Sequence, residues 1–222
     1  MSSHLVILSM LFGAAAGAFL PRIAYRLTVP FGAPPRAACD DCGRPFLPGA
    51  AGWVHTGPGY RPAIVLALLA GLLAAVLGPV PQLPVHLLAA VPGLLLVMID
   101  LRCLRLPDRI VGALTLIGGI PLALLLPGRI VPALAAGLLV GAGYLVIALL
   151  PGRGLGLGDV KLGATLAFLL GFAGWPAVAV GFGTAHLLNG AIAAWLLVTR
   201  RGRPIPFGPA LLFGFWVGVT AA

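Results

Sequence analysis

Glutamate is absent from this chain of 222 residues, and charged side chains make up only 9% of it. Soluble globular domains carry about 25% charged residues, whereas this chain is 60% hydrophobic. The shortage of charge excludes a soluble domain and predicts an integral membrane protein surrounded by the lipid bilayer. The net charge of +9 does not predict a nucleic-acid partner, because loop arginines that fix membrane topology explain the excess.

Three residue types are scarce, and their scarcity excludes two classes of protease and a disulfide-stabilised fold. Without glutamate, the H-E-x-x-H motif of zinc proteases cannot form. All three serines lie within the first nine residues, which excludes a membrane serine protease. The three cysteines do not make a disulfide framework: Cys39 and Cys42 form one C-x-x-C pair and Cys103 stands alone, as expected for reduced thiols.

Long runs without charge predict the helices. A spanning helix needs about 20 residues, so each of the two 38-residue runs accommodates two crossings joined by a turn. Gly and Pro residues at 78–84 and 171–176 interrupt these two runs near the middle. We therefore expect an all-α polytopic membrane protein with about eight transmembrane helices. They are taken from the uncharged runs 1–21, 62–99, 110–128, 130–152, 162–199 and 204–222.

The positive charges predict which side of the membrane each loop occupies. Eight crossings place both termini on one side, and 13 of the 14 Lys and Arg residues then fall in loops on the other side. By the positive-inside rule those loops are cytoplasmic, and all five aspartates lie there too. Arginines follow the first apolar run rather than precede it, so we expect a retained helix with its N-terminus outside, not a cleaved signal peptide.

Residues 27–61 are the one substantial segment outside the predicted helices. They are rich in Pro and Gly, and about 35 residues cannot bury a core unaided. We therefore expect residues 1–222 to form a single membrane-embedded domain with a reduced cytoplasmic loop at 27–61.

Asp100 and Asp159 are the candidate catalytic residues. Both lie at the cytoplasmic ends of predicted helices, so the two carboxylates can meet in the bundle. A close carboxylate pair shares one proton, which equips one member to activate water and the other to hydrogen-bond the attacked carbonyl. Gly156 and Gly158 remove side chains beside Asp159, which permits unusual backbone angles and the approach of an extended peptide.

Spacing alone leaves other interpretations of the two aspartates open. Asp159 is also a favoured N-cap for a helix beginning at Val160. Asp100 also suits an ion pair with Arg102 or Arg105 in a solvated loop. Aspartates in membrane proteins relay protons as well, which makes a proton-coupled transporter an alternative function.

Two motifs around the aspartates resemble those of a known family. Residues 99–108 read I-D-L-R-C-L-R-L-P-D, and residues 156–162 read G-L-G-D-V-K-L. Together they resemble the prepilin peptidases, or type IV prepilin leader peptidases, in the G-x-G-D class of intramembrane aspartic proteases. Residues 17–27 are similar to the family's first-helix motif, and P-I-P-F-G-P at 204–209 resembles the start of its last helix.

The resemblance implies a site and an activity. Asp100 and Asp159 correspond to the family's catalytic pair. The remaining motif residues are expected to support substrate binding: Gly156, Gly158, Asp108 and Lys161. The implied enzyme is an endopeptidase of the bacterial inner (cytoplasmic) membrane that removes the leader peptides of type IV prepilins or pseudopilins, for a pilus or type II secretion. A non-catalytic assembly protein of such a system is an alternative.

The cytoplasmic loop departs from the family pattern. Members that also methylate the new N-terminus with S-adenosylmethionine carry two C-x-x-C pairs that bind zinc, whereas this chain has only Cys39 and Cys42. A structural zinc site needs four ligands; His55 offers a third and no fourth is evident. Ala18 and Pro21 stand where the family commonly has Ser and Asn. We expect peptidase activity that requires no cofactor, and the departures argue against zinc and methyl transfer.

Overall fold

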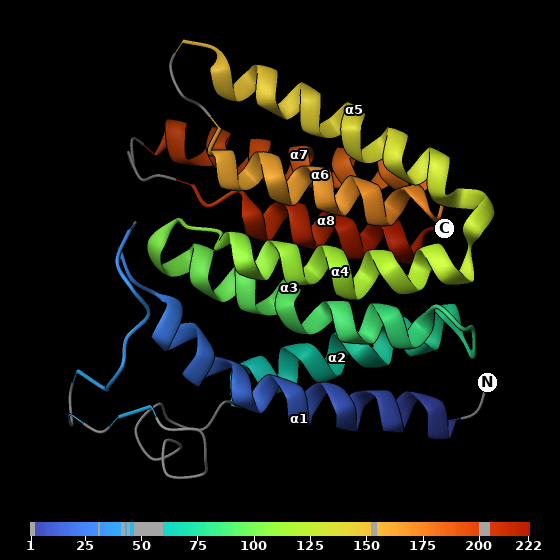
Figure 1. Ribbon diagram of the computed structural model, residues 1–222, viewed down its shortest axis with the longest axis horizontal. Helices are drawn as coiled ribbons and strands as arrows, with labels where there is room; N and C mark the ends of the chain where they lie inside the picture. The colour runs from blue at the N-terminus through green and yellow to red at the C-terminus, as the bar shows by residue number, and fades with distance from the viewer. Residues whose placement is uncertain are drawn as a thin grey trace. The chain divides into compact units, whose positions relative to one another are not determined.

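The computed structural model describes residues 3–30, 32–40, 43, 45–46, 60–151, 155–199 and 205–222. This part of the chain contains eight α-helices and one short 3₁₀ turn, and it has no strand beyond an isolated bridge between Ala38 and Pro45. The protein is therefore all-α, as the uncharged runs predict (Figure 1).

The helix bounds follow the uncharged runs closely. The elements are α1 (Ser3–Leu27), α2 (Tyr60–Leu77), α3 (Leu83–Cys103), α4 (Asp108–Leu125), η2 (Pro127–Arg129), α5 (Ile130–Leu149), α6 (Leu157–Gly171), α7 (Trp175–Val198) and α8 (Gly208–Thr220). Within the described residues, six helices are long and apolar enough to cross a membrane, namely α1 to α5 and α7. At 15 and 13 residues, α6 and α8 are shorter than the expected span.

Glycines mark the two predicted breaks inside the long apolar runs. Gly78 follows α2 with φ at 69°, and Gly174 precedes α7 with φ at 120°, conformations that residues with a Cβ rarely adopt. The Gly78 amide donates to the carbonyl of Ala74, and the Gly174 amide donates to that of Leu170. Each glycine thereby satisfies a carbonyl at the end of one helix while the chain turns toward the next.

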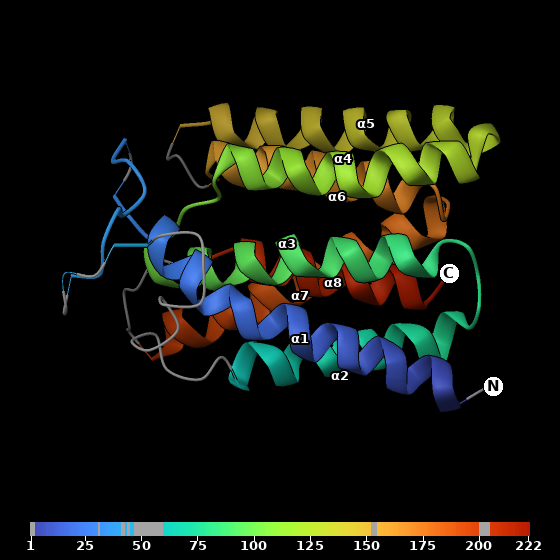
Figure 2. The same cartoon turned by 60° about the horizontal axis from the view of Figure 1, so that its bottom comes forward.

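The chain folds as two compact units, residues 1–105 and 106–222. In the first unit, α1 packs along α2, and α3 contacts both (Figure 2). Gly13 and Gly17 permit the close approach of α1 to α2, since a Cβ on Gly17 would lie 2.6 Å from the carbonyl oxygen of Pro62. This G-x-x-x-G spacing favours backbone contact between membrane helices. That residues 1–222 form one domain stays a prediction.

Helix α6 is the core of the second unit. It contacts α4, α5, α7 and α8, and nine of its 15 residues are buried. The side-chain hydroxyls of Thr115 on α4 and Thr165 on α6 lie 2.9 Å apart and join these helices by a hydrogen bond. A Cβ on Gly171 would lie 2.5 Å from the Cα of Ala133 on α5. Contacts with four helices fix the position of α6, and with it the first turn that carries Asp159.

Candidate functional site

Asp100 lies in the last turn of α3 and only 4% of its surface is exposed. Its backbone carbonyl accepts a hydrogen bond of 2.9 Å from the amide of Leu104, which ends the helix with φ at 52°. The expectation of a solvated loop around Asp100 is therefore wrong, because the helix continues past the aspartate to Cys103. The carboxylate lies at a helix C-terminus, where the macrodipole disfavours negative charge.

The turn that follows Asp100 is anchored to another segment of the first unit. Arg105 donates from Nη1 to the carbonyl oxygens of Val29 and Pro30, at 3.4 and 3.0 Å. These carbonyls belong to the segment that leaves α1. Arg105 therefore ties the end of α3 to the chain just beyond α1.

Asp159 is the third residue of α6 and is partly exposed. Its amide donates to the carbonyl of Gly156 at 3.0 Å, and Gly156 is the N-cap residue. The N-cap interpretation of Asp159 is therefore wrong by three positions, since the helix already includes Leu157 and Gly158. In the first turn, the macrodipole favours the ionised carboxylate. Asp100 belongs to the first unit and Asp159 to the second, and their pairing stays a prediction.

The two motif glycines have packing roles rather than unusual backbone angles. Gly156 has φ −76° and ψ 146°, an extended conformation open to any residue, so the expectation of special backbone freedom is wrong there. A Cβ on Gly156 would lie 3.1 Å from Oδ2 of Asp159, and a Cβ on Gly158 would lie 3.1 Å from Cβ of the buried Leu106. Gly156 thus leaves room for the carboxylate, and Gly158 for Leu106.

Asp108 and Lys161 form an ion pair, with Oδ2 and Nζ 2.7 Å apart. Asp108 is the first residue of α4, and Lys161 lies on α6 two residues after Asp159. The L-P-D and G-x-G-D-x-K motifs therefore touch at two points inside the second unit, through this ion pair and through Leu106 against Gly158. Both charged side chains are more than half exposed, so the pair contributes at most about 1 kcal/mol.

Tyr144 is a neighbour of the Asp159 turn that sequence reasoning missed. A Cβ on Gly163 would lie 2.6 Å from the Tyr144 ring, and Gly163 is four residues from Asp159 on the same face of α6. The Tyr144 hydroxyl lies 3.2 Å from Nε2 of His186, whose Nδ1 lies 2.7 Å from the carbonyl of Phe182. Nδ1 therefore donates to the carbonyl of Phe182, because a carbonyl oxygen only accepts. No local pattern relates these residues to the motif.

The described part of the loop does not supply the ligands of a zinc site. Cys39 is buried, at 8% exposure. Cys42 and His55 lie outside the described residues, as does Pro204 of the last-helix motif. Among the residues that the structure describes, no group of three or more His, Cys, Asp or Glu side chains gathers. The described residues therefore do not supply the four ligands of a structural zinc site.

Comparison with known proteins places these observations in a family. Residues 87–199 match the model of the type IV leader peptidase family. The prepilin leader peptidase/N-methyltransferases of Aeromonas hydrophila and Aeromonas salmonicida are each 32% identical over 165 residues. These matches cover 70% of this chain but 56% and 55% of the relatives, so the chain spans little more than half of their length. No solved structure matches the chain. By the family match and by its identity to these relatives, the chain belongs to the type IV leader peptidase family.

Proposed function

We propose that this protein is a membrane aspartic endopeptidase. Its substrates are type IV prepilins or pseudopilins, whose leader peptides it removes at the cytoplasmic face of the bacterial inner membrane. The observation that carries the proposal is that the region matched to the family, residues 87–199, contains both motif aspartates, Asp100 and Asp159. The predicted topology places both aspartates on the cytoplasmic side.

In the proposed reaction, Asp100 and Asp159 share one proton and no covalent intermediate forms. The ionised carboxylate accepts a proton from water, and the water oxygen attacks the scissile carbonyl carbon. The protonated carboxyl hydrogen-bonds the carbonyl oxygen, and a proton then passes to the leaving amine as the C–N bond breaks.

The different surroundings of the two aspartates support a division of these roles. Asp159 lies in the first turn of α6, where the helix macrodipole favours a negative charge. Asp100 is buried in the last turn of α3, where both burial and the macrodipole disfavour a charge. We therefore assign water activation to Asp159 and the shared proton to Asp100.

Leader removal by the purified protein tests the proposal. The enzyme is incubated with a prepilin in lipid vesicles, and the intact masses of substrate and product are measured. Asp100→Asn and Asp159→Asn should each slow cleavage by about 10²–10⁴-fold, because neither amide can take part in proton sharing. Asp108→Asn is the comparison variant: loss of its exposed ion pair with Lys161 should leave kcat near the parent value, and the expected role of Asp108 in substrate binding would appear as a raised KM. Substantial cleavage by either amide variant of the pair would refute the aspartic mechanism.

A wild-type protein that leaves every leader intact would refute the peptidase proposal itself. Uptake of protons into vesicles by the same preparation would then favour the transporter alternative, since buried aspartates also relay protons.

A further inference from the structure

The chain that leaves α1 is held by hydrogen bonds to its backbone carbonyls. A helix C-terminus leaves its last four carbonyls without helical partners. Thr28 satisfies the carbonyl of Ala24 through both its amide and its hydroxyl, at 2.9 and 2.6 Å. The carbonyl of Leu27 accepts the amide of Val29 at 3.0 Å. Arg36 and Arg105 donate to the other carbonyls from Tyr25 to Pro30.

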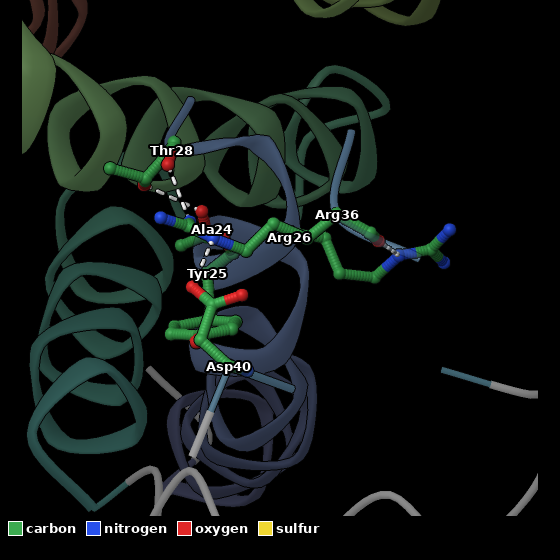
Figure 3. A network of polar contacts seen from close by, with 6 residues as sticks. All are labelled: Ala24, Tyr25, Arg26, Thr28, Arg36 and Asp40. Atoms are coloured by element: carbon green, nitrogen blue, oxygen red, sulfur yellow. Dashed lines mark hydrogen bonds and ion pairs between the residues drawn. The ribbon is translucent and has the colours of Figure 1, made fainter. Parts of the chain in front are cut away.

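Arg36 binds the end of α1 with most of its polar atoms. Nη1 donates to the carbonyl of Tyr25 at 2.7 Å and also to that of Thr28. The backbone amide of Arg36 donates to the carbonyl of Arg26 at 2.9 Å. A cation at this end of a helix is also favoured by the macrodipole. Figure 3 shows this network at close range.

The plane of the Arg36 guanidinium is fixed by further contacts. Its central carbon lies 4.7 Å from the centre of the Tyr25 ring, and Nε donates to Oδ2 of Asp40 at 2.9 Å. The amide of Asp40 in turn donates to the Tyr25 hydroxyl at 3.2 Å. A planar fork that stacks on an aromatic ring and donates in several directions is specific to arginine, and lysine cannot reproduce it.

Arg105 extends these contacts to the catalytic helix. It holds the carbonyls of Val29 and Pro30, directly after the residues that Arg36 binds. Its neighbour Leu104 donates to the backbone carbonyl of Asp100. A continuous set of hydrogen bonds therefore runs from Arg36, through the end of α1 and Arg105, to the turn that carries Asp100.

We propose that Arg36 and Arg105 form an arginine clamp that positions the end of α3, and thereby Asp100, for catalysis. The inference deepens the proposed function and rests on it. The clamp needs no metal, because every one of its bonds joins two protein atoms. Arg36 and Arg105 are positioning residues, since they act on Asp100 through the backbone and not on the substrate.

Cys103 provides a native reporter of the clamp. It lies in the last turn of α3, three residues after Asp100, and its Sγ contacts the carbonyl of Ile99 at 3.3 Å. It directly precedes Leu104, whose amide donates to the carbonyl of Asp100, and it is two positions before Arg105, so it lies at the helix end that the clamp holds. With Cys39→Ala and Cys42→Ala, Cys103 is the one thiol of the chain, so its rate of reaction with a small maleimide reports opening of this helix end.

The test compares three charge-preserving variants in that background. Arg36→Lys and Arg105→Lys lose the guanidinium fork, and Arg102→Lys is the matched control, from an exposed arginine on the same helix end. We expect the two clamp variants to raise the Cys103 labelling rate about tenfold, equivalent to about 1.4 kcal/mol and comparable to the loss of one charged hydrogen bond. The same variants should lower kcat for leader cleavage about tenfold or more and leave KM within about twofold. Arg102→Lys should match the parent protein in both measurements, and a chelator should change neither.

Three results would overturn the proposal. Parental labelling rates in both clamp variants would show that the arginines do not hold this helix end. Equal effects of Arg102→Lys would show that local charge density, not the clamp, matters. Faster labelling with unchanged kcat would show that the clamp does not position Asp100. If the parent protein cleaves no leader, the proposed function fails on its own, and the labelling rates still decide whether the clamp exists.

Discussion

Gly158 offers a quantitative test of how the two motifs fit together. A Cβ at this position would lie 3.1 Å from Cβ of Leu106, and 3.6 and 3.8 Å from its Cδ1 and Cγ. Gly158→Ala adds all three contacts, of which only the one at 3.1 Å is tight. The strain of that contact is offset by the better helix propensity of alanine, about 1 kcal/mol. Gly158→Val adds two further methyl groups beside Leu106 and should cost about 1–3 kcal/mol through overpacking.

The assay is a double-mutant cycle on thermal or denaturant unfolding in detergent, with leader cleavage measured alongside. Leu106→Ala removes the two atoms at 3.6 and 3.8 Å, so Gly158→Val should cost about 1 kcal/mol less in that background than in the wild type. The double variant should also cleave leaders faster than Gly158→Val alone, when each rate is compared for the fraction of protein that is folded. If the two substitutions are additive in stability, Leu106 does not limit the space at Gly158. Loss of cleavage with unchanged stability would instead favour backbone approach by the substrate.

Two further predictions concern the surface ion pair and the loop. The Asp108–Lys161 pair should show a coupling energy of about 0.2–1 kcal/mol in a cycle with Asp108→Asn and Lys161→Gln, and the coupling should fade in about 1 M salt; a large, salt-independent coupling would contradict its exposed geometry. Cys39→Ala with Cys42→Ala should leave leader cleavage nearly intact, and the product should lack the methyl group of about 14 Da on its new N-terminal amine. A fully methylated product, made with no other methyltransferase present, would show that the reduced loop suffices for methyl transfer.

The sequence predicted the helices well because their ends carry strong local information. The uncharged runs match the observed helices, and the breakers contain Gly78 and Gly174, whose left-handed φ values are a property of the residue type. The start of α6 was predicted less well. Aspartate is a favoured N-cap, but the carbonyl of Gly156 already accepts the amides of both Asp159 and Val160, so the helix begins earlier.

The contacts that surround the candidate residues could not be predicted from local sequence patterns. Leu106 and Gly158 are 52 positions apart, and nothing in either motif indicates that Leu106 occupies the space where a side chain at position 158 would lie. Arg36 lies in a segment without periodicity, so its bonds to the end of α1 depend on a loop conformation that propensities do not encode. The motifs identify Asp100 and Asp159 by resemblance, whereas the supporting contacts emerge only from the fold.

Each of the two compact units is continuous in sequence, with the boundary between Arg105 and Leu106. A ribosome therefore completes the first unit, including Asp100, before the second begins. At about 5–20 residues per second, the 59 positions that separate Asp100 from Asp159 take about 3–12 s to synthesise. During membrane insertion the nascent protein thus carries one of the two proposed catalytic aspartates without the other. Proteolytic competence, on the proposed mechanism, arises only late in biosynthesis.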